Sequence, residues 1–456
     1  MRIEMPEKVK LIIKTLQENG FEAYAVGGCV RDALLGRTPH DWDVTTSALP
    51  QEVKKLFRRT VDTGILHGTV TVLLDKEGFE VTTYRVDGAY EDARHPKEVS
   101  FTASLAEDLK RRDFTINAMA YNDTDGLVDL FDGATDLQKK MIRCVGNARE
   151  RFSEDALRIL RAFRFSAQLD FTIAEETEKA AAELAETLRK ISAERIYAEL
   201  SKLVVSSHPE RLLLAYRSGI TAVVLPEFDR MMQTKQNHPS HWENVGEHCL
   251  RVTALTSPFS EYAGEEGFSE SRFRILRLAA LLHDVAKPVC HVVDEQGIDH
   301  FAGHPKEGAV LAKKILKRLK TDNETQELVA GLVLYHDYPF LPEERAMRRA
   351  MNKIGTELFP LLFALKRADL QAHREPYASN GLELLNQAWE CYRQIQKKGE
   401  CTSLKELAVS GTDLIDAGFL PGKELGLVLQ ELLQLVLENP EKNEREILLS
   451  YAKEHF

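Results

Sequence analysis

The chain has 456 residues, too many for one hydrophobic core, so we expect two to four domains. Hydrophobic residues make up 43% and charged residues 29%, as in ordinary soluble globular proteins, and the net charge of −11 argues against non-specific nucleic-acid binding through overall charge. The first residues lack the apolar core of a secretory signal, and no segment approaches the roughly 20 apolar residues of a membrane span. We therefore expect a cytoplasmic protein with no membrane contact.

Short strand patterns and helices alternate up to about residue 145. Residues 23–28 (AYAVGG) are typical of a strand, 30–36 (VRDALLG) of a short helix, and 68–74 with 79–85 of a hairpin. Further along, strand patterns nearly vanish and apolar residues recur with helical spacing, as in SEDALRILRAFRFSAQL and ILRLAALLHDVAK. The sequence predicts an α+β protein in which a mixed or antiparallel sheet with helices is followed by a mostly helical body.

A glycine pair lies between the first strand and the first short helix of this head. Gly27 and Gly28 would let backbone amides approach a phosphate, because the start of the helix near Val30 favours an anion. Arg31 could reach the same phosphate oxygens with two hydrogen bonds. A glycine pair alone is usually only a turn, so the residues that follow decide its interpretation.

Two aspartates follow, separated by one residue. On a strand Asp41 and Asp43 would point to one face and Trp42 to the other, with the aspartate Cα atoms about 6.5 Å apart at roughly 3.3 Å per residue. Carboxylates that close repel each other unless a cation neutralises them, although a solvated turn is the alternative. Glu80 is a third carboxylate, which alone would be an exposed strand residue. Together with the glycines and Arg31, the set suits phosphoryl transfer with two metal ions.

The successive motifs VGGCVRDALLGRTPHDWDVTT, GTVTVLL, EVTTYRVDGAYEDARHPKEVSF, LKRRDFTINAMAYN and SEDALRILRAFRF resemble those of class II tRNA nucleotidyltransferases. This family comprises the CCA-adding enzymes and their bacterial poly(A) polymerase relatives, and the resemblance runs over about residues 1–230. It implies a polymerase-β-like head in which Asp41 and Asp43 bind Mg²⁺ and Glu80 assists. It further implies that Gly28, Arg31 and Arg112 contact the incoming nucleotide.

The segment SEDALRILRAFRF predicts a helix with Ser153 as its N-cap. On this helix Asp155 and Arg158 would be i, i+3 neighbours that offer an acceptor beside a donor, although a solvated face with internal ion pairs is the ordinary interpretation. Cytosine and adenine each present an amino donor beside an unprotonated ring nitrogen, whereas uracil and guanine do not, so the pair would match C and A. The resemblance assigns this role to Asp155 and Arg158, and adds Arg161 and Arg164 as residues lining the nucleotide pocket.

The same region is locally basic. Residues 143–164 contain six arginines against three acidic residues, so this stretch could bind RNA although the whole chain is acidic.

The substrates follow from the resemblance. In the family, enzymes that add only two cytidines lack much of the segment that corresponds to residues 86–101, which is intact here with Gly88 and Pro96. Full CCA addition and A-only addition therefore stay open. We expect the former: addition of C, C and A to the tRNA 3′ end from CTP and ATP, with release of pyrophosphate and without a nucleic-acid template.

Histidines concentrate after residue 238, in an order that resembles HD-domain metal phosphohydrolases. The resemblance implies His248, His283, Asp284 and Asp369 as ligands of a divalent metal, with His304 and His336 available for a second ion. Adjacent residues on a helix diverge by about 100°, so His283 and Asp284 would not obviously reach one metal. Lys287-Pro288 is expected to end the helix just beyond them. A helical domain without activity is the alternative.

The expected domains are a nucleotidyltransferase head at 1–145, a helical neck at 146–235 that selects the base and binds RNA, an HD domain at 236–380, and a helical tail at 381–456 that binds the tRNA body. Two other functions stay open: an HD phosphohydrolase with a degenerate head, and a non-catalytic RNA-binding protein. Nothing in the sequence indicates an oligomeric state.

Overall fold

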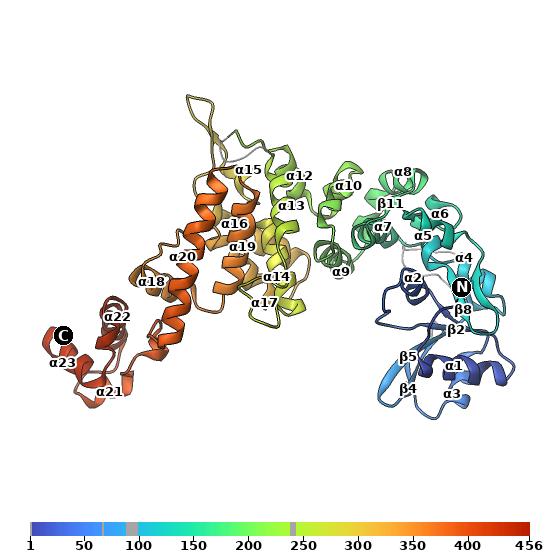
Figure 1. The fold of residues 1–456 in the computed structure, drawn as a ribbon, viewed down its shortest axis with the longest axis horizontal. Coiled ribbons are helices and arrows are strands. Elements are labelled where there is room, and N and C mark those ends of the chain that lie inside the picture. Colours follow the sequence, from blue (N-terminus) through green and yellow to red (C-terminus); the bar gives the residue numbers. More distant parts are fainter. Residues whose placement is uncertain (1, 66–67, 88–98, 238–242) are drawn as a thin grey trace. The chain divides into compact units, whose positions relative to one another are not determined.

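The computed structural model of the protein describes residues 2–65, 68–87, 99–237 and 243–456. It divides into two compact units, Met1–Pro226 and Glu227–Phe456, each of which is described by itself (Figure 1). Gly88 and Pro96 of the predicted 86–101 segment lie outside the described residues. Among the described residues, no helix combines the length and the apolar character needed to span a membrane.

The first unit is built on a seven-stranded mixed sheet (Figure 1). Neighbouring strands are antiparallel except β2 and β5, which run parallel. The predicted hairpin is present as β4 and β5. In spatial order the strands are β3 (Thr60–Gly64), β4 (Thr69–Leu74), β5 (Glu77–Thr83), β2 (Val44–Thr46), β1 (Ala23–Val26), β8 (Met119–Asn122) and β9 (Gly126–Asp129).

One face of the sheet is covered by α1 (Glu7–Glu18) and α3 (Pro50–Leu56). The apolar residues of α1 recur at helical spacing and form the buried stripe Val9, Ile12, Ile13 and Leu16. The other face packs against α4 (Leu105–Lys110), whose leucines join Tyr24, Val26, Tyr84 and Ala120 in a small core. Tyr84 is fully buried there. This second face carries the candidate site.

The rest of the first unit, as far as the structure describes it, is helical apart from two short strand pairings. The pairs are β6 (Arg85–Asp87) with β7 (Val99–Phe101), and β10 (Met141–Ile142) with β11 (Thr172–Ile173). The remaining helices are α2 (Gly28–Leu34), α5 (Gly133–Gln138), α6 (Ala148–Glu154), α7 (Leu157–Leu169), α8 (Glu175–Glu183), α9 (Ala193–Val204), α10 (Leu212–Arg217) and α11 (Ile220–Val224). Helices α7 and α9 pack closely against each other.

The second unit is helical except for the two-residue strands β12 (Val292–Val293) and β13 (Asp299–His300) (Figure 1). Its body consists of α13 (Val245–Leu255), α14 (Glu270–Leu282), α15 (Lys287–Cys290), α16 (His304–Arg318), α17 (Asn323–Tyr335), α18 (Glu344–Ile354), α19 (Phe359–Ala372) and α20 (Tyr377–Lys398). Helix α12 (Pro226–Gln233) precedes this body, and α21 (Gly411–Asp416), α22 (Lys423–Glu438) and α23 (Arg445–His455) end the chain around a core of their own.

The predicted α+β fold class is therefore confirmed, with a mixed-sheet head and a helical remainder. Two local predictions are wrong. The strand after the aspartates begins only at Val44, and the predicted single helix from Ser153 is broken, since α6 ends at Glu154 and α7 begins at Leu157. Ser153 lies inside α6, whose N-cap is Asn147.

Candidate functional site

Three carboxylates meet where β2 and β5 run side by side. Val44 lies opposite Val81 in this parallel pair, so the preceding Asp43 comes next to Glu80 on the neighbouring strand. Asp41 and Asp43 precede β2 in extended chain, both exposed, while Trp42 between them is 8% exposed and packs inward. The alternation of exposed and buried side chains that the sequence predicts is therefore present, although these three residues lie before β2 begins. The three carboxylates line an open pocket of about 810 Å³.

The carboxylates influence one another electrostatically. Although Asp43 is exposed, the surrounding protein removes part of its hydration, and this desolvation together with the negative charges of Glu80 and Asp41 raises its pKa, while the Arg112 guanidinium lowers it. A group of acidic side chains whose charges repel is neutralised well by a hard divalent cation with oxygen ligands. Asp41, Asp43 and Glu80 could therefore hold such a cation.

The glycine pair makes room for two arginines. Gly27 has a φ of +84°, which favours glycine, and a Cβ atom there would lie 2.9 Å from Arg112 Nη1, so a side chain would displace that guanidinium. Helix α2 begins at Gly28, two residues earlier than the sequence indicated. Arg112 Nη2 lies 3.5 Å from Asp108 Oδ2, and its Nε is buried without a hydrogen-bond partner among the described residues. Such an unsatisfied donor suits a ligand site.

Arg31 begins a chain of polar contacts between the sheet domain and α7. Its Nη1 donates to Asn117 Oδ1 at 2.8 Å, and Asn117 Nδ2 donates to Asp113 Oδ1 at 3.2 Å. Arg161 Nε then donates to Asp113 Oδ2 at 2.7 Å. Burial alone would raise the pKa of Asp113, but the charge and hydrogen bond of Arg161 lower it to about 2. Asp113 and Asn117 were missed by sequence reasoning, although both lie in the LKRRDFTIN motif.

Phe165 was also missed, and three guanidinium groups surround it. The Cζ atoms of Arg31, Arg161 and Arg164 lie 5.0, 5.4 and 3.7 Å from its ring centroid, within cation–π distance. Arg164 is 7% exposed and donates from Nε to Glu199 of α9 at 2.5 Å. The Phe165 ring therefore packs against three of the arginines that the family resemblance places around the incoming nucleotide.

Asp155 and Arg158 do not form the predicted i, i+3 pair on one helix. Asp155 follows the end of α6, and its Oδ1 accepts from the Leu157 amide at 3.0 Å, which caps the start of α7 and interrupts the helix. Its Oδ2 accepts from Arg195 Nη2 of α9 at 2.9 Å. Arg158 Nη1 donates to Glu154 Oε2 at 2.6 Å. Arg195 and Glu154 were not predicted, because their positions depend on this helix break and on α9.

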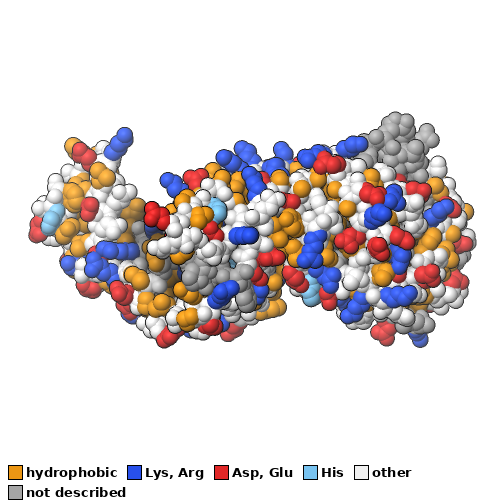
Figure 2. Space-filling model, turned by 90° about the horizontal axis from the view of Figure 1, so that it is seen from above, with side chains coloured by type: hydrophobic (Ala, Val, Ile, Leu, Met, Phe, Trp, Pro, Cys, Tyr) orange, Lys and Arg blue, Asp and Glu red, His pale blue; other side chains and the backbone are white. Residues whose placement is uncertain are grey.

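Each arginine of the basic stretch 143–164 has an acidic partner. Four of these partners lie in other segments of the chain, so the sequence window did not reveal them. The ion pairs are Arg143 with Asp136, Arg149 with Glu183, Arg151 and Arg158 with Glu154, Arg161 with Asp113, and Arg164 with Glu199. On the face shown in Figure 2, basic and acidic side chains are likewise interspersed.

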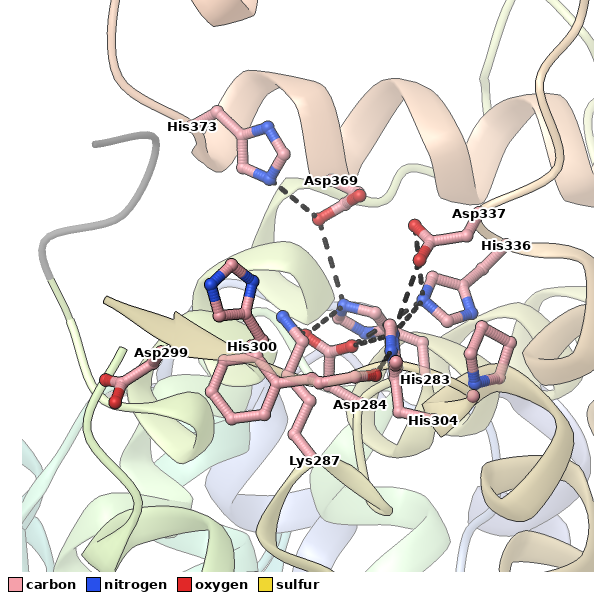
Figure 3. A pocket seen from close by; sticks show the side chains of 14 residues that line it. His283, Asp284, Lys287, Asp299, His300, His304, His336, Asp337, Asp369 and His373 are labelled. Atoms are coloured by element: carbon pink, nitrogen blue, oxygen red, sulfur yellow. Dashed lines mark hydrogen bonds and ion pairs between the residues drawn. The ribbon is translucent and has the colours of Figure 1, made fainter. Parts of the chain in front are cut away.

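A second cluster lies in the helical unit, around a pocket of about 360 Å³ (Figure 3). The structure brings together all six residues that the HD resemblance implies. His248 comes from α13, His304 begins α16, His336 follows α17, Asp369 belongs to α19, and His283 with Asp284 directly follows α14. Asp337, His373 and Lys287 also line this pocket and were not predicted as ligands.

Asp284 is shared by the two halves of the cluster. Its Oδ2 lies 3.2 Å from His283 Nε2, whereas its Oδ1 lies 3.1 Å from His304 Nε2 and 3.5 Å from His336 Nε2. His283 and Asp284 approach each other directly after α14, which ends at Leu282, although His283 keeps helical dihedrals. Pro288 does not end that helix, which has already stopped. Lys287 instead holds Asp284 through an Nζ–Oδ2 ion pair of 2.7 Å.

Three imidazoles are oriented by the backbone. The Nδ1 atoms of His283, His304 and His336 lie 2.8, 2.8 and 2.7 Å from the carbonyl oxygens of the residues three positions earlier. A ring that donates through Nδ1 keeps a lone pair on Nε2, as a metal ligand requires. Burial alone would raise the pKa of Asp284, but His283 and Lys287 hold it well below its usual range. The three overlapping groups of donors in this cluster could hold a metal ion.

Comparison with known families matches three parts of the chain. Residues 23–143 match the "Poly A polymerase head domain", residues 170–232 the "Probable RNA and SrmB- binding site of polymerase A", and residues 304–452 a tRNA nucleotidyltransferase domain 2.

Relatives and solved structures match nearly the whole chain. A CCA-adding enzyme of Lactiplantibacillus plantarum is 35% identical over 98% of this chain and 96% of its own, and one of Streptococcus suis is 36% identical over 97% and 95%. The crystal structure of the Bacillus stearothermophilus CCA-adding enzyme in complex with CTP superposes with a TM-score of 0.72 at 28% identity, covering 99% of this chain and 98% of its own. The chain therefore belongs to the family of CCA-adding enzymes, which are tRNA nucleotidyltransferases.

Proposed function

We propose that this protein adds C, C and A to the 3′ end of tRNA from CTP and ATP, with release of pyrophosphate and without a nucleic-acid template. The observation that carries the proposal is the convergence of Asp41, Asp43 and Glu80 beside Arg112. The relatives named above are CCA-adding enzymes, and one solved neighbour from Thermotoga maritima is described as complexed with tRNA. Mg²⁺, Asp41, Asp43 and Glu80 form the proposed reaction centre, with Asp41 and Asp43 as the ligands.

The chain's own residues organise the reaction. Bound Mg²⁺ would lower the pKa of the attacking 3′-hydroxyl and stabilise the leaving pyrophosphate. Gly28 keeps the backbone close to the triphosphate, while Arg31 and Arg112 balance its negative charge. Arg161 and Arg164, fixed against Phe165, line the nucleotide pocket.

Base selection is assigned to Asp155 and Arg158. An acceptor beside a donor matches the amino group and ring nitrogen of cytosine and adenine, whereas uracil or guanine would leave charged groups unpaired. Arg195 and Glu154 support this role because they fix the two side chains through hydrogen bonds to Asp155 and from Arg158. The neck of residues 146–235 is thus the proposed base-selecting domain, between a head at 1–145 and the segments 236–380 and 381–456, the last of which we assign to the tRNA body.

The experiment offers purified protein three tRNA transcripts, ending before CCA, after one C and after CC, with each labelled nucleotide in turn. We expect CTP to extend the first two and ATP to extend the third, and Asp41→Ala to abolish all three reactions. Extension of only the CC-ended transcript by ATP would instead establish the A-adding alternative. Binding of tRNA without any nucleotide addition in Mg²⁺ would point to a non-catalytic RNA-binding protein.

The cluster in the helical unit supports a second activity, metal-dependent hydrolysis of phosphate esters by an HD domain. The observation that favours it is the set of backbone-oriented imidazoles around the shared carboxylate of Asp284. His248, His283, Asp284 and Asp369 are the proposed ligands of one divalent ion, and His304 and His336 those of a second. A bound divalent ion would supply an activated water and neutralise the phosphate ester.

Hydrolysis of a 2′,3′-cyclic nucleotide in the presence of Mn²⁺, Co²⁺, Ni²⁺ or Zn²⁺ tests this site. We expect His283→Ala to abolish hydrolysis and leave nucleotide addition unchanged, whereas Asp41→Ala should do the reverse. Hydrolysis that persists in His283→Ala would exclude this site. Hydrolysis by the wild type that is untouched by Asp41→Ala, with no nucleotide addition at all, would favour a phosphohydrolase with a degenerate head.

A further inference from the structure

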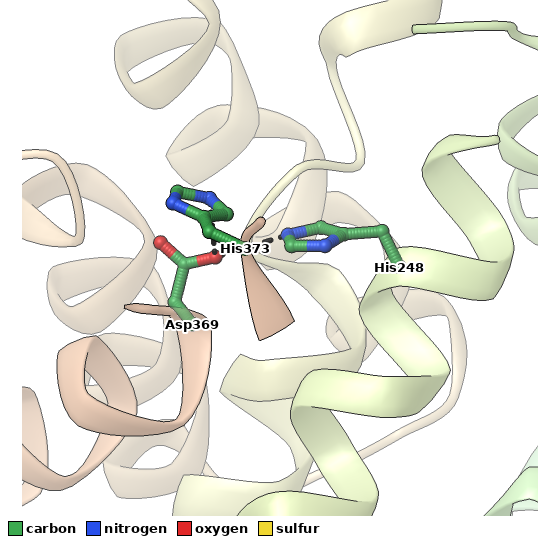
Figure 4. Close-up of side chains that lie close together, drawn as sticks. All are labelled: His248, Asp369 and His373. Carbon is green, nitrogen blue, oxygen red and sulfur yellow. Dashed lines mark hydrogen bonds and ion pairs between the residues drawn. The ribbon is translucent and has the colours of Figure 1, made fainter. Parts of the chain in front are cut away.

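His373 is a histidine at the mouth of the second cluster that the HD resemblance does not include. It directly follows the end of α19, four residues after Asp369, so both side chains lie on the same side of the helix. Its Nε2 is 3.6 Å from Asp369 Oδ1, and its ring stacks on that of His248 with a centroid separation of 5.7 Å and an angle of 22° (Figure 4).

One oxygen atom is surrounded by three imidazoles. Asp369 Oδ1 lies 3.0 Å from His248 Nε2, 3.7 Å from His283 Nε2 and 3.6 Å from His373 Nε2. The last two separations exceed the length of a hydrogen bond. They do match the spacing of donor atoms that share one cation, because two ligands at about 2.1 Å from a metal lie about 3 to 4 Å apart.

We propose that His373 is a further imidazole ligand in the metal centre proposed for His248, His283, Asp284 and Asp369, where it binds the ion together with His248 and Asp369. The inference rests on the proposed metal centre and deepens it by adding a ligand. His373 is the most exposed of the three imidazoles, with 19% of its side chain accessible against 1–2% for His248 and His283. It therefore closes the solvent side of the ion.

The added ligand defines the class of metal. His248, His373 and Asp369 offer two imidazoles and one carboxylate, a nitrogen-rich set that favours divalent transition metals over Mg²⁺, which prefers oxygen ligands and retained waters. The ion at this site is accordingly Mn²⁺, Fe²⁺, Co²⁺, Ni²⁺ or Zn²⁺. His300 provides a matched control, since it lines the same pocket but its Nε2 contacts Asp294 Oδ2 at 2.7 Å.

The test measures Co²⁺ binding to the full chain and its visible absorption spectrum in the wild type, His373→Ala, His373→Gln and His300→Ala. We expect both His373 variants to bind Co²⁺ at least about 10-fold more weakly. Removal of a group that only hydrogen-bonds to a metal ligand already weakens binding by about that factor, and removal of a ligand itself should cost no less. We also expect a changed absorption band, since one nitrogen donor is lost. His300→Ala should match the wild type, and thermal unfolding followed by circular dichroism checks that the helical unit of each variant is folded.

Two negative outcomes are distinct. Affinity and spectrum that are unchanged in His373→Ala, with stoichiometric binding in the wild type, overturn the role of His373 alone. A wild type that retains no Co²⁺ overturns the proposed metal centre together with this inference.

Discussion

Asp113 is a buried carboxylate that joins the head to α7 through Arg161. Its pKa of about 2 lies below the value near 3.8 expected in the unfolded chain, despite the opposing effect of burial. A lowered folded-state pKa stabilises the protein above pH 4, and this stabilisation is lost as the pH falls from about 4 towards 2. The charged side chain thus contributes about 2 kcal/mol at neutral pH, from the size of the pKa shift.

Asp113→Asn should remove this contribution and flatten the acid side of the stability profile. The measurement is the free energy of unfolding against pH from 2 to 7, for the wild type and the variant. Asp132, exposed and not part of this network, gives the control Asp132→Asn. The same loss of stability between about pH 4 and pH 2 in the wild type and in Asp113→Asn would contradict the role of the ion pair.

Arg195 holds one oxygen of Asp155 through a hydrogen bond of 2.9 Å, while the Leu157 amide holds the other. Arg195→Ala should relax base selection, because a carboxylate that can rotate discriminates less well between an amino group and a carbonyl. Loss of a hydrogen bond to a charged group costs about 1.5 kcal/mol, so we expect roughly a 10-fold rise in UTP incorporation relative to CTP.

The measurement is the ratio of kcat/KM for CTP and UTP on a transcript ending before CCA, with Arg195→Lys as a partial rescue. Arg189→Ala is the control, since Arg189 is exposed and pairs with Glu186 on the surface. An equal fall in activity with both nucleotides, with selectivity intact, would mean that Arg195 supports the fold alone.

For single residues, the sequence predicted the direction of a side chain where that direction follows from the local backbone alone. Asp41, Trp42 and Asp43 alternate as an extended chain requires, so their relative directions were predictable. Phe165 and Arg195 were missed because their contacts depend on how α7 packs against the head and α9. The side-chain cap by Asp155 was missed because the helical periodicity continues on both sides of it.

Among the elements, α18 anchors the C-terminal helices to the helical body. Arg348 is 4% exposed, and it donates from Nε to the Leu437 carbonyl and from Nη1 to Glu400 Oε2, both at 2.8 Å. Arg348→Ala should lower the free energy of unfolding by about 3 kcal/mol, because it leaves the largely buried carboxylate of Glu400 with only the longer ion pair to Lys398.

Thermal unfolding and limited proteolysis after α20 check this prediction, and cleavage should become faster in Arg348→Ala. Arg349→Ala is the matched control: its guanidinium pairs with Glu438 but is half exposed, so its removal should change stability by less than about 1 kcal/mol. Equal effects of the two substitutions would contradict the anchoring role of Arg348.

The elements themselves were largely predictable, since the hairpin of β4 and β5 and the long amphipathic helices have clear periodicity. The parallel pairing of β2 with β5 was not, because it joins strands separated by two others in the chain. This pairing brings Glu80 next to Asp43. The sequence could name the three carboxylates, but their proximity depends on a long-range register.

At the scale of the whole molecule, two sites with different ligands occupy separate units of one chain. Metal removal should therefore stop both proposed activities, and different ions should restore them. After EDTA treatment and dialysis, we expect Mg²⁺ to restore nucleotide addition, because the head site offers oxygen ligands. Hydrolysis should return with Mn²⁺, Co²⁺, Ni²⁺ or Zn²⁺, because the second site is rich in imidazole.

The measurement is the rate of each reaction against the concentration of each added ion. His283→Ala, which should add nucleotides in Mg²⁺ but hydrolyse nothing with any ion, is the control that assigns hydrolysis to the second unit. Recovery of hydrolysis with Mg²⁺ alone would contradict the assignment of a nitrogen-rich centre.

The pairing of all six arginines of residues 143–164 with carboxylates has a consequence for ionic strength. Binding of RNA by unpaired cations releases condensed counterions, and affinity then falls steeply with salt. Guanidinium groups already neutralised by carboxylates of the protein release few, so tRNA affinity should decline only gently between 50 and 200 mM salt, on the order of 10-fold rather than the 10³-fold or more expected of many phosphate contacts. Filter binding across that range measures the slope, and a steep decline would mean that these ion pairs open when tRNA binds.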